Sequence, residues 1–258
     1  MKNDTIDYKF AFIAIIIAYF FAQQIVVYFK PELEKYISLL QILLFLIPVI
    51  ILTENNFRIQ YKINFKFSIS IIPVILWALV GISFIEIGGS IVIKHILPNF
   101  ILQQYNYLYD NYFNSVSYLL INNSREVLEF ATLTFCIAVV PSVCEEILFR
   151  GYLMQNINQK HSQGIAIIVS ALIFAIIHLN PITFIPIFIL GLYLGTLFYL
   201  TGSILPAILL HFLNNFIVIL SVNYYYGEQV NITNIWFGIV TLIIGIIIMV
   251  LSIKGIKE

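Results

Sequence analysis

Eight apolar runs dominate this sequence, and most are close to the length that crosses a lipid bilayer. A spanning helix needs about 20 predominantly apolar residues, and helices are one of only two structures that satisfy every backbone hydrogen bond inside lipid. The charged fraction is 10%, against about 25% in a soluble domain. We therefore predict an all-α polytopic membrane protein in which residues 1–258 form a single integral membrane domain. The predicted helices span about 9–29, 36–53, 67–92, 127–158, 164–179, 182–200, 203–222 and 233–253.

The distribution of Lys and Arg predicts how these helices are oriented. Eight spans place both termini on one side. If that side is cytoplasmic, the inner loops hold eight Lys and Arg residues, or nine with Arg150, and the outer loops hold four. The positive-inside rule then favours an N-in, C-in topology. Between the third and fourth helices, the Tyr-rich segment 95–125 is typical of an interfacial or extramembrane element.

Net charge and composition limit the partners. The formal net charge is zero, so no basic face predicts binding to nucleic acid. The partner that the composition does predict is the lipid bilayer of a multi-pass cell-membrane protein. Richness in Ile, Asn and Tyr is typical of an AT-rich bacterial genome. The oligomeric state does not follow from the sequence.

Polar and ionisable side chains inside the predicted spans gather in three places in the later half of the chain. The stretch EEILFR contains Glu145, Glu146 and Arg150, FAIIH ends at His178, and HFLNN begins at His211 and ends at Asn215. A charged residue at a helix centre costs about 2.5–3.5 kcal/mol on an insertion scale, so clustered residues of this kind are functional candidates.

Each place also has a purely structural interpretation. Glu146 and Arg150 are four residues apart, share a helix face and can form a salt bridge at a helix end. A lone histidine can simply be packed against a backbone partner, and an imidazole with an amide can link two helices. The salt bridge leaves Glu145 unexplained, because neighbouring residues point ~100° apart on a helix.

Distances from the predicted turns favour one shared site. If the fourth and fifth helices form a hairpin, Glu145 and His178 each lie ~21–23 Å from its turn. His211 and Asn215 lie ~12 and ~18 Å from the turn before the seventh helix, which is on the same side of the membrane. Helix tilt absorbs the remaining mismatch. We therefore predict that these four side chains meet inside the membrane.

The chemistry of this set favours hydrolysis. A carboxylate that faces an imidazole can activate water, and a second imidazole with an amide can stabilise an oxyanion. Two histidines and two glutamates are also a ligand set for zinc, which would make the site a metalloendopeptidase. The chain has no HExxH stretch, yet a zinc site assembled from separate helices stays open. We predict no metal and no other cofactor.

The three motifs resemble those of the CAAX protease and bacteriocin-processing group (CPBP, also called Abi) of intramembrane glutamic endopeptidases. The family pattern is Glu-Glu-x-x-x-Arg, then Phe-x-x-x-His, then His-x-x-x-Asn. It is present here as EEILFR at 145–150, FAIIH at 174–178 and HFLNN at 211–215. The resemblance covers about 127–222, which we identify as the catalytic core, and no motif position departs from the pattern.

The resemblance implies a role for each motif residue. Glu145 and His178 would activate the attacking water, while His211 and Asn215 would form the oxyanion site. The substrate would be a peptide or membrane-protein segment, such as a CAAX protein or the precursor of a bacteriocin or signalling peptide. The family's site opens toward the cytoplasm, which suits the predicted topology.

Glu146, Arg150 and Phe174 would be supporting residues, with the phenylalanine shaping the pocket. Two other functions stay open. One is a non-catalytic scaffold or bacteriocin-immunity protein of the same fold, and the other is a proton-coupled transporter. Outside the motifs, Glu86 could either face the cavity or cap a helix at the interface.

Overall fold

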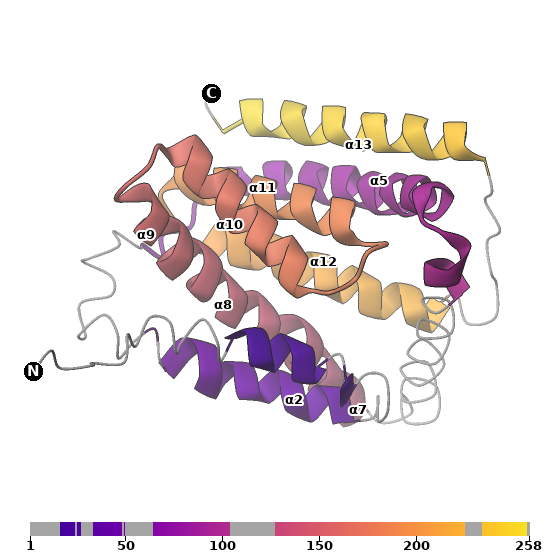
Figure 1. Cartoon of the computed structure of the whole chain (residues 1–258). Helices are drawn as coiled ribbons and strands as arrows, with labels where there is room; N and C mark the ends of the chain where they lie inside the picture. The colour runs from indigo at the N-terminus through magenta and orange to yellow at the C-terminus, as the bar shows by residue number, and fades with distance from the viewer. Residues whose placement is uncertain are drawn as a thin grey trace, which may run out of the picture.

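The computed structural model describes residues 16–23, 25–26, 33–47, 49, 64–103, 127–224 and 234–256. These residues form helices and short connections, with no strand among them. Figure 1 shows the helices packed as one bundle. The predicted all-α membrane fold is therefore confirmed. The first predicted helix is described only in its second half, and the Tyr-rich segment lies outside the described residues beyond residue 103.

The helices occur in the predicted order. Residues 16–23 and 25–26 are helical. They are followed by α2 (Glu34–Gln41) with the π-helical segment η2 (Ile42–Leu46), then by the short 3-10 turn η3 (Ile69–Ile71) and α5 (Ile72–Ile96). The long fourth helix consists of α7 (Val127–Thr134), η4 (Phe135–Val139), α8 (Val140–Glu146), η5 (Ile147–Leu153) and α9 (Met154–Asn158). The chain ends with α10 (Gln163–Ile177), α11 (Phe184–Thr201), α12 (Leu205–Tyr224) and α13 (Ile235–Lys254).

Four of the described helices are long and apolar enough to span a bilayer, and three shorter ones are apolar. The long ones are Ile69–Ile96, Phe130–Asn158, Phe184–Thr201 and Ile235–Lys254. The shorter ones are Tyr36–Leu46, Gln163–Ile177 and Leu205–Ser221. The fifth predicted helix is therefore short, as expected from the sequence. The number of helices that cross the membrane in cells stays a prediction.

The third helix runs farther than predicted, to Ile96 instead of residue 92. Its last turn is still apolar at Ile91 and Ile93, so the helix continues until Pro98 forces a stop. Leu97 has an extended backbone, with ψ of 140°, because a following proline disfavours the helical conformation.

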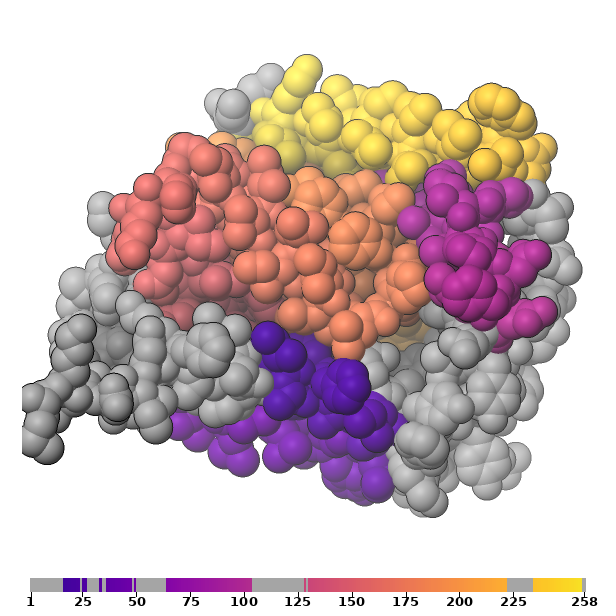
Figure 2. All heavy atoms as spheres, in the orientation of Figure 1, coloured from indigo at the N-terminus to yellow at the C-terminus, as the bar shows by residue number. Residues whose placement is uncertain are grey.

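The α5–α13 pair forms one side of the bundle through unusually close backbone contact. A Cβ atom added to Gly88 would lie 2.5 Å from the carbonyl oxygen of Gly238, and one added to Gly245 would lie 2.6 Å from that of Gly81. In lipid, such close approach is a main source of helix association. Figure 2 shows the yellow atoms of α13 as a continuous layer over this side of the molecule.

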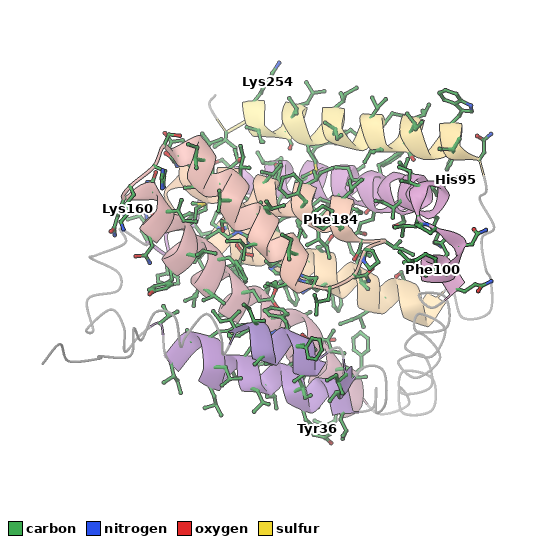
Figure 3. The ribbon with its side chains drawn as sticks, viewed as in Figure 1. Tyr36, His95, Phe100, Lys160, Phe184 and Lys254 are labelled. Carbon is green, nitrogen blue, oxygen red and sulfur yellow. The ribbon has the colours of Figure 1, made fainter. Side chains whose placement is uncertain are left out.

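The bundle has two distinct ends. Lys160 and Lys254 lie at one end, and His95 and Phe100 lie at the other (Figure 3). Residues 159–162 form the turn between α9 and α10 at the Lys160 end, so the predicted hairpin of the fourth and fifth helices is confirmed. The short turn before α12, with Gly202 at φ of 59°, is also where the sequence predicts it. The N-in, C-in orientation stays a prediction.

Candidate active site

The motif EEILFR lies where the fourth helix changes from α to π geometry. Glu145 and Glu146 end α8, and Arg150 follows in η5. All three side chains are buried, although they are ionisable and the rest of this helix is apolar. π-helical turns inside α-helices are often found at functional sites, because they alter which side chains face inward. The ionisable groups therefore face the protein interior and not the lipid.

Arg150 binds two oxygen atoms and one aromatic ring of the protein. Its Nη1 donates to Glu146 Oε1 at 2.8 Å, and its Nη2 donates to the carbonyl oxygen of Gly191 at 3.2 Å. The guanidinium carbon lies 4.6 Å from the centre of the Phe174 ring, in cation–π geometry. The predicted Glu146–Arg150 pair is therefore present, buried in the core and not at a helix end.

His211 brings the first and third motifs together. Its Nδ1 donates to Glu146 Oε1 at 2.9 Å, and its Nε2 lies 4.0 Å from Glu145 Oε2. Adjacent glutamates thus contact opposite sides of one imidazole. α12 packs against α8 along this contact. The prediction that these helices bring their polar residues to one depth is confirmed for this pair of motifs.

Gln41 is a polar contact that the motifs did not reveal. Its Nε2 donates to Glu145 Oε1 at 2.9 Å, and the side chain is buried. It ends α2, directly before the π-helical segment η2. The only sequence signal was an isolated glutamine in an apolar run of the chain's first half, where no motif gave it a role.

His178 caps the C-terminal end of α10, near residues of the first and third motifs. Its Nδ1 donates to the carbonyl oxygen of Phe174 at 2.6 Å, which leaves Nε2 as the basic nitrogen of the neutral ring. The His178 ring lies 4.7 Å from the Phe174 ring and 5.7 Å from that of Phe20. Glu145, Arg150 and His211 are close enough to act on it electrostatically.

Leu179 follows with a positive φ of 50°. This conformation is uncommon for a residue with a side chain and is found most often at functional sites. It ends the helix immediately after His178.

A polar cavity of about 420 Å³ contains the second and third motifs. The residues that line it are Glu86, Ser90, Lys94, Phe174, His178, Ile182, Thr183, Pro186, Ile187, Leu190, His211, Asn214, Asn215 and Val218. Of the seven predicted site residues, Phe174, His178, His211 and Asn215 line this cavity. Glu145, Glu146 and Arg150 lie behind His211 as its buried support.

The cavity settles the two interpretations of Glu86. This side chain faces the cavity, and the side chain of Asn214 hydrogen-bonds to it. Glu86 is thus not a helix cap at the interface. The sequence predicted neither a role for Asn214 nor its contact with Glu86, because Asn214 lies next to the motif residue Asn215 and belongs to no motif position itself.

The position of the cavity bears on two expectations from the sequence, namely the N-in topology and a site that opens toward the cytoplasm. Its lining comes from the last turns of α5, the start of α11 and the second half of α12, which all lie toward the His95 end. The N-in topology places the Lys160 end in the cytoplasm. In this fold the cavity would then open on the opposite side, whereas the family resemblance implies a cytoplasmic opening. Only one of these two expectations can hold.

The polar side chains of the site can transfer protons and bind an oxyanion. A carboxylate, two imidazoles and an amide meet around one cavity, and both imidazoles are oriented through Nδ1. Orienting one ring nitrogen fixes the role of the other. Within the described ranges, no three His, Cys, Asp or Glu side chains form a group that would hold a metal ion. The absence of a cofactor stays a prediction.

Comparison with known proteins identifies the part of the chain that carries this site. Residues 127–217 match the family model described as type II CAAX prenyl endopeptidase Rce1-like. No curated protein and no solved structure matches the chain. The matched segment contains all three motifs and the helices from α8 to α12 that position them, apart from the last turns of α12. The match of residues 127–217 to the Rce1-like family model of type II CAAX prenyl endopeptidases agrees with the resemblance of the three motifs.

Proposed function

We propose that this protein is an intramembrane endopeptidase that hydrolyses a peptide bond with a water molecule activated by Glu145 and His178. The Rce1-like family is a protease family, which supports a membrane-embedded peptidase at the family level. The observation that carries the proposal is the meeting of Glu145, Glu146 and Arg150 with His211 inside the bundle, beside a polar cavity.

The attacking water would be deprotonated by Glu145, which it would reach from the cavity beside His211. Gln41 holds one oxygen of this carboxylate, and the other oxygen faces His211 Nε2 across 4.0 Å. At this distance the two groups make no direct hydrogen bond, so this oxygen is the one that remains to accept a proton from water. The basic Nε2 of His178 would take part in moving the proton to the leaving amine. General acid–base catalysis of this kind supplies about 10²–10⁴-fold in rate.

The carbonyl oxygen of the substrate would become negatively charged as water attacks. Asn215 supplies amide N–H groups from the cavity wall. His211, when it carries both ring protons, donates to Glu146 through Nδ1 and presents an Nε2–H group to the reaction site. Preorganised donors of this type are worth about 10²–10³ in kcat each. The pair of Glu146 and Arg150 would keep this imidazole in place.

The experiment that tests the function compares peptides from cells with wild-type protein and cells with Glu145→Ala or His178→Ala. A protease predicts precursors that accumulate, and products that disappear, in both variants. Full biological activity in both variants would favour the scaffold or immunity function instead. Solute uptake into proteoliposomes without any peptide cleavage would favour the transporter.

The side of the membrane on which the substrate is cut follows from the orientation. Cysteines introduced at Lys160 and Lys94 can be labelled in intact cells with a membrane-impermeant maleimide. The charge bias predicts that Lys94→Cys reacts from outside and Lys160→Cys does not. The cavity would then receive extracytoplasmic peptides. If Lys160→Cys reacts from outside and Lys94→Cys does not, the topology predicted from the charge bias is wrong and the site faces the cytoplasm.

A further inference from the structure

Three polar side chains of α5 line the polar cavity, although they lie outside both the motifs and the matched segment. Glu86, Ser90 and Lys94 follow one another at four-residue spacing, so they share one face of the helix about 6 Å apart. We call them the α5 polar stripe. An intramembrane ionisable residue is costly and is seldom kept without a role. The stripe faces the cavity that contains His178 and His211.

The repeat of the stripe matches the repeat of an extended peptide. A β-like chain presents backbone groups in the same direction every second residue, which is about 6.6–6.8 Å. At membrane depth each backbone N–H and C=O group needs a partner, because no bulk water is present to replace it. Side chains spaced about 6 Å apart along a helix can supply these partners to alternate residues of a bound peptide.

Another part of the cavity lining suits the side chains of such a peptide. It consists of apolar residues at the start of α11 and just before it, among them Ile182, Pro186, Ile187 and Leu190. Because successive side chains of an extended chain point in opposite directions, alternate apolar side chains would pack against this wall. The lining of the cavity therefore combines the polar stripe of α5 with apolar residues of α11.

The stripe also sits on a rigid element. α5 is held on one side by its glycine-mediated contact with α13, and Gly89 packs against Pro186 of α11, where an added Cβ would lie 3.0 Å from the proline ring. A binding surface on a fixed helix positions a ligand more accurately than one on a loop. Lys94 is the outermost member of the stripe and is exposed, so its ammonium group lies at the mouth of the cavity.

We propose that the α5 polar stripe binds the extended segment of the substrate on one side of the scissile bond, and that Lys94 binds a carboxylate of that segment. This inference rests on the proposed peptidase function. Glu86 and Lys94 are about 12 Å apart along the helix, a distance that three to four extended residues cover. The carboxylate is either the free C-terminus of a short segment or an acidic side chain at the same distance.

The test uses purified protein in detergent and a library of short fluorophore–quencher peptides with apolar residues randomised at the C-terminal positions. The library is made with a free carboxylate, with a C-terminal amide, and as an amide with aspartate at the last position. Wild type should show a KM about threefold to fivefold lower for the free acid than for the amide, as expected for one exposed ion pair. Lys94→Met should abolish this difference with kcat changed less than twofold.

Lys254→Met provides the matched control, because Lys254 is a lysine at the opposite end of the bundle (Figure 3). It should leave the preference for the free acid unchanged. A preference for the free acid that persists in Lys94→Met, or that Lys254→Met removes equally, would overturn the role of Lys94. Restoration of tight binding by the aspartate amide would identify an acidic side chain as a sufficient source of the carboxylate.

A binding measurement separates this inference from the proposed function. Fluorescence anisotropy of a labelled library, with Glu145→Gln protein to prevent turnover, reports affinity alone. If cleavage requires Glu145 but neither KM nor affinity responds to Lys94→Met, the peptidase stands and the stripe is wrong. If Lys94→Met weakens binding of the free acid while wild type cleaves nothing, Lys94 binds a peptide carboxylate and the peptidase is wrong. If neither effect is seen, both are wrong.

Discussion

Two cavities lie back to back in this molecule, and they differ mainly in what lines them. The polar cavity has a volume of about 420 Å³, and the apolar one about 550 Å³. Phe149 lines the apolar cavity and Phe174 lines the polar one, and their rings meet edge to face with centroids 5.0 Å apart. Even adjacent residues divide between them, since His178 lines one and Leu179 the other.

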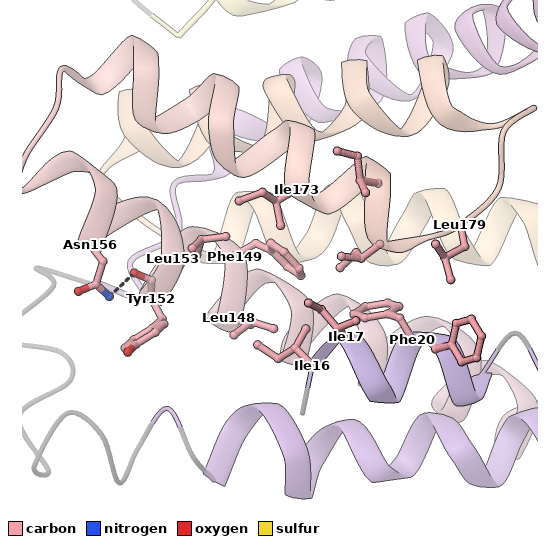
Figure 4. A pocket seen from close by; sticks show the side chains of 13 residues that line it. Ile16, Ile17, Phe20, Leu148, Phe149, Tyr152, Leu153, Asn156, Ile173 and Leu179 are labelled. Carbon is pink, nitrogen blue, oxygen red and sulfur yellow. Dashed lines mark hydrogen bonds between the residues drawn. The ribbon is translucent and has the colours of Figure 1, made fainter. Parts of the chain in front are cut away.

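The apolar cavity is formed by the N-terminal helical residues 16–23 together with the fourth helix and α10. Figure 4 shows Ile16, Ile17 and Phe20 on the N-terminal helix and Leu148 beside them on the fourth helix. Tyr152 and Asn156 are the polar residues in its lining, and the Asn156 amide is engaged by the carbonyl oxygen of Tyr152 at 2.8 Å. A peptide there would leave its backbone without partners, whereas a hydrocarbon chain would not. The comparison indicates that only the polar cavity suits peptide chemistry.

The largest effect should come from breaking the buried ion pair behind the polar cavity. Arg150→Met leaves Glu146 buried without its cation, so the free energy of unfolding should fall by about 3–5 kcal/mol. Thermal unfolding in detergent measures this loss. A loss below about 1 kcal/mol would contradict a structural role for the pair.

The matched double variant separates loss of the pair from loss of an apolar contact. Glu146→Gln with Arg150→Met removes both charges together, and the glutamine still offers an oxygen to His211. Because no uncompensated charge remains, the double variant should be more stable than Arg150→Met alone. Equal or greater destabilisation would show that the arginine acts through packing on Phe174.

A smaller effect should follow from Gln41→Leu. Glu145 loses the donor at 2.9 Å, and a buried acceptor left without its partner costs about 1–3 kcal/mol of stability. Peptide cleavage should slow about tenfold, which corresponds to about 1.4 kcal/mol of lost positioning. The control is Leu40→Met, since Leu40 is exposed on the neighbouring position of α2. A Gln41→Leu enzyme as fast as this control would exclude Gln41 from the site.

The smallest effect should come from the apolar cavity. Asn156→Ala removes a hydrogen bond to the preceding turn of its own helix at a partly exposed position, so the stability should change by about 0.5 kcal/mol. The rate of cleavage should stay within twofold of wild type. A large loss of cleavage would mean that the apolar cavity takes part in the reaction. The polar and apolar cavities would then not differ in function.

The helices and the depth of the site could be predicted because they depend on local features. Apolar length defined the spans, and short turns near Lys160 and Gly202 fixed which residues lie at equal height. The four-residue spacing of Glu146 and Arg150 was enough to predict their pairing. Each motif sits within one continuous helix, so its spacing indicates which side chains lie close together, while their catalytic roles stay a prediction.

Other features depend on contacts between segments far apart in the sequence, so no local pattern could reveal them. Gln41 contacts Glu145 across 104 residues, and Glu86 approaches Asn214 only after α5 and α12 pack together. The convergence of two adjacent glutamates on one histidine was unexpected, because a regular helix points neighbours apart. The imidazole of His211 lies between the two carboxylates and so makes the convergence possible.

The most direct test of the central claim is the rate of peptide hydrolysis by purified Glu145→Gln protein compared with wild type, in the presence of a metal chelator. Glutamine keeps the size of the side chain and an acceptor for Gln41 but cannot take a proton from water. We predict that kcat falls by about 10²–10⁴-fold, that the melting temperature stays unchanged, and that the chelator leaves wild-type hydrolysis intact. A Glu145→Gln variant that cleaves as fast as wild type would contradict the account.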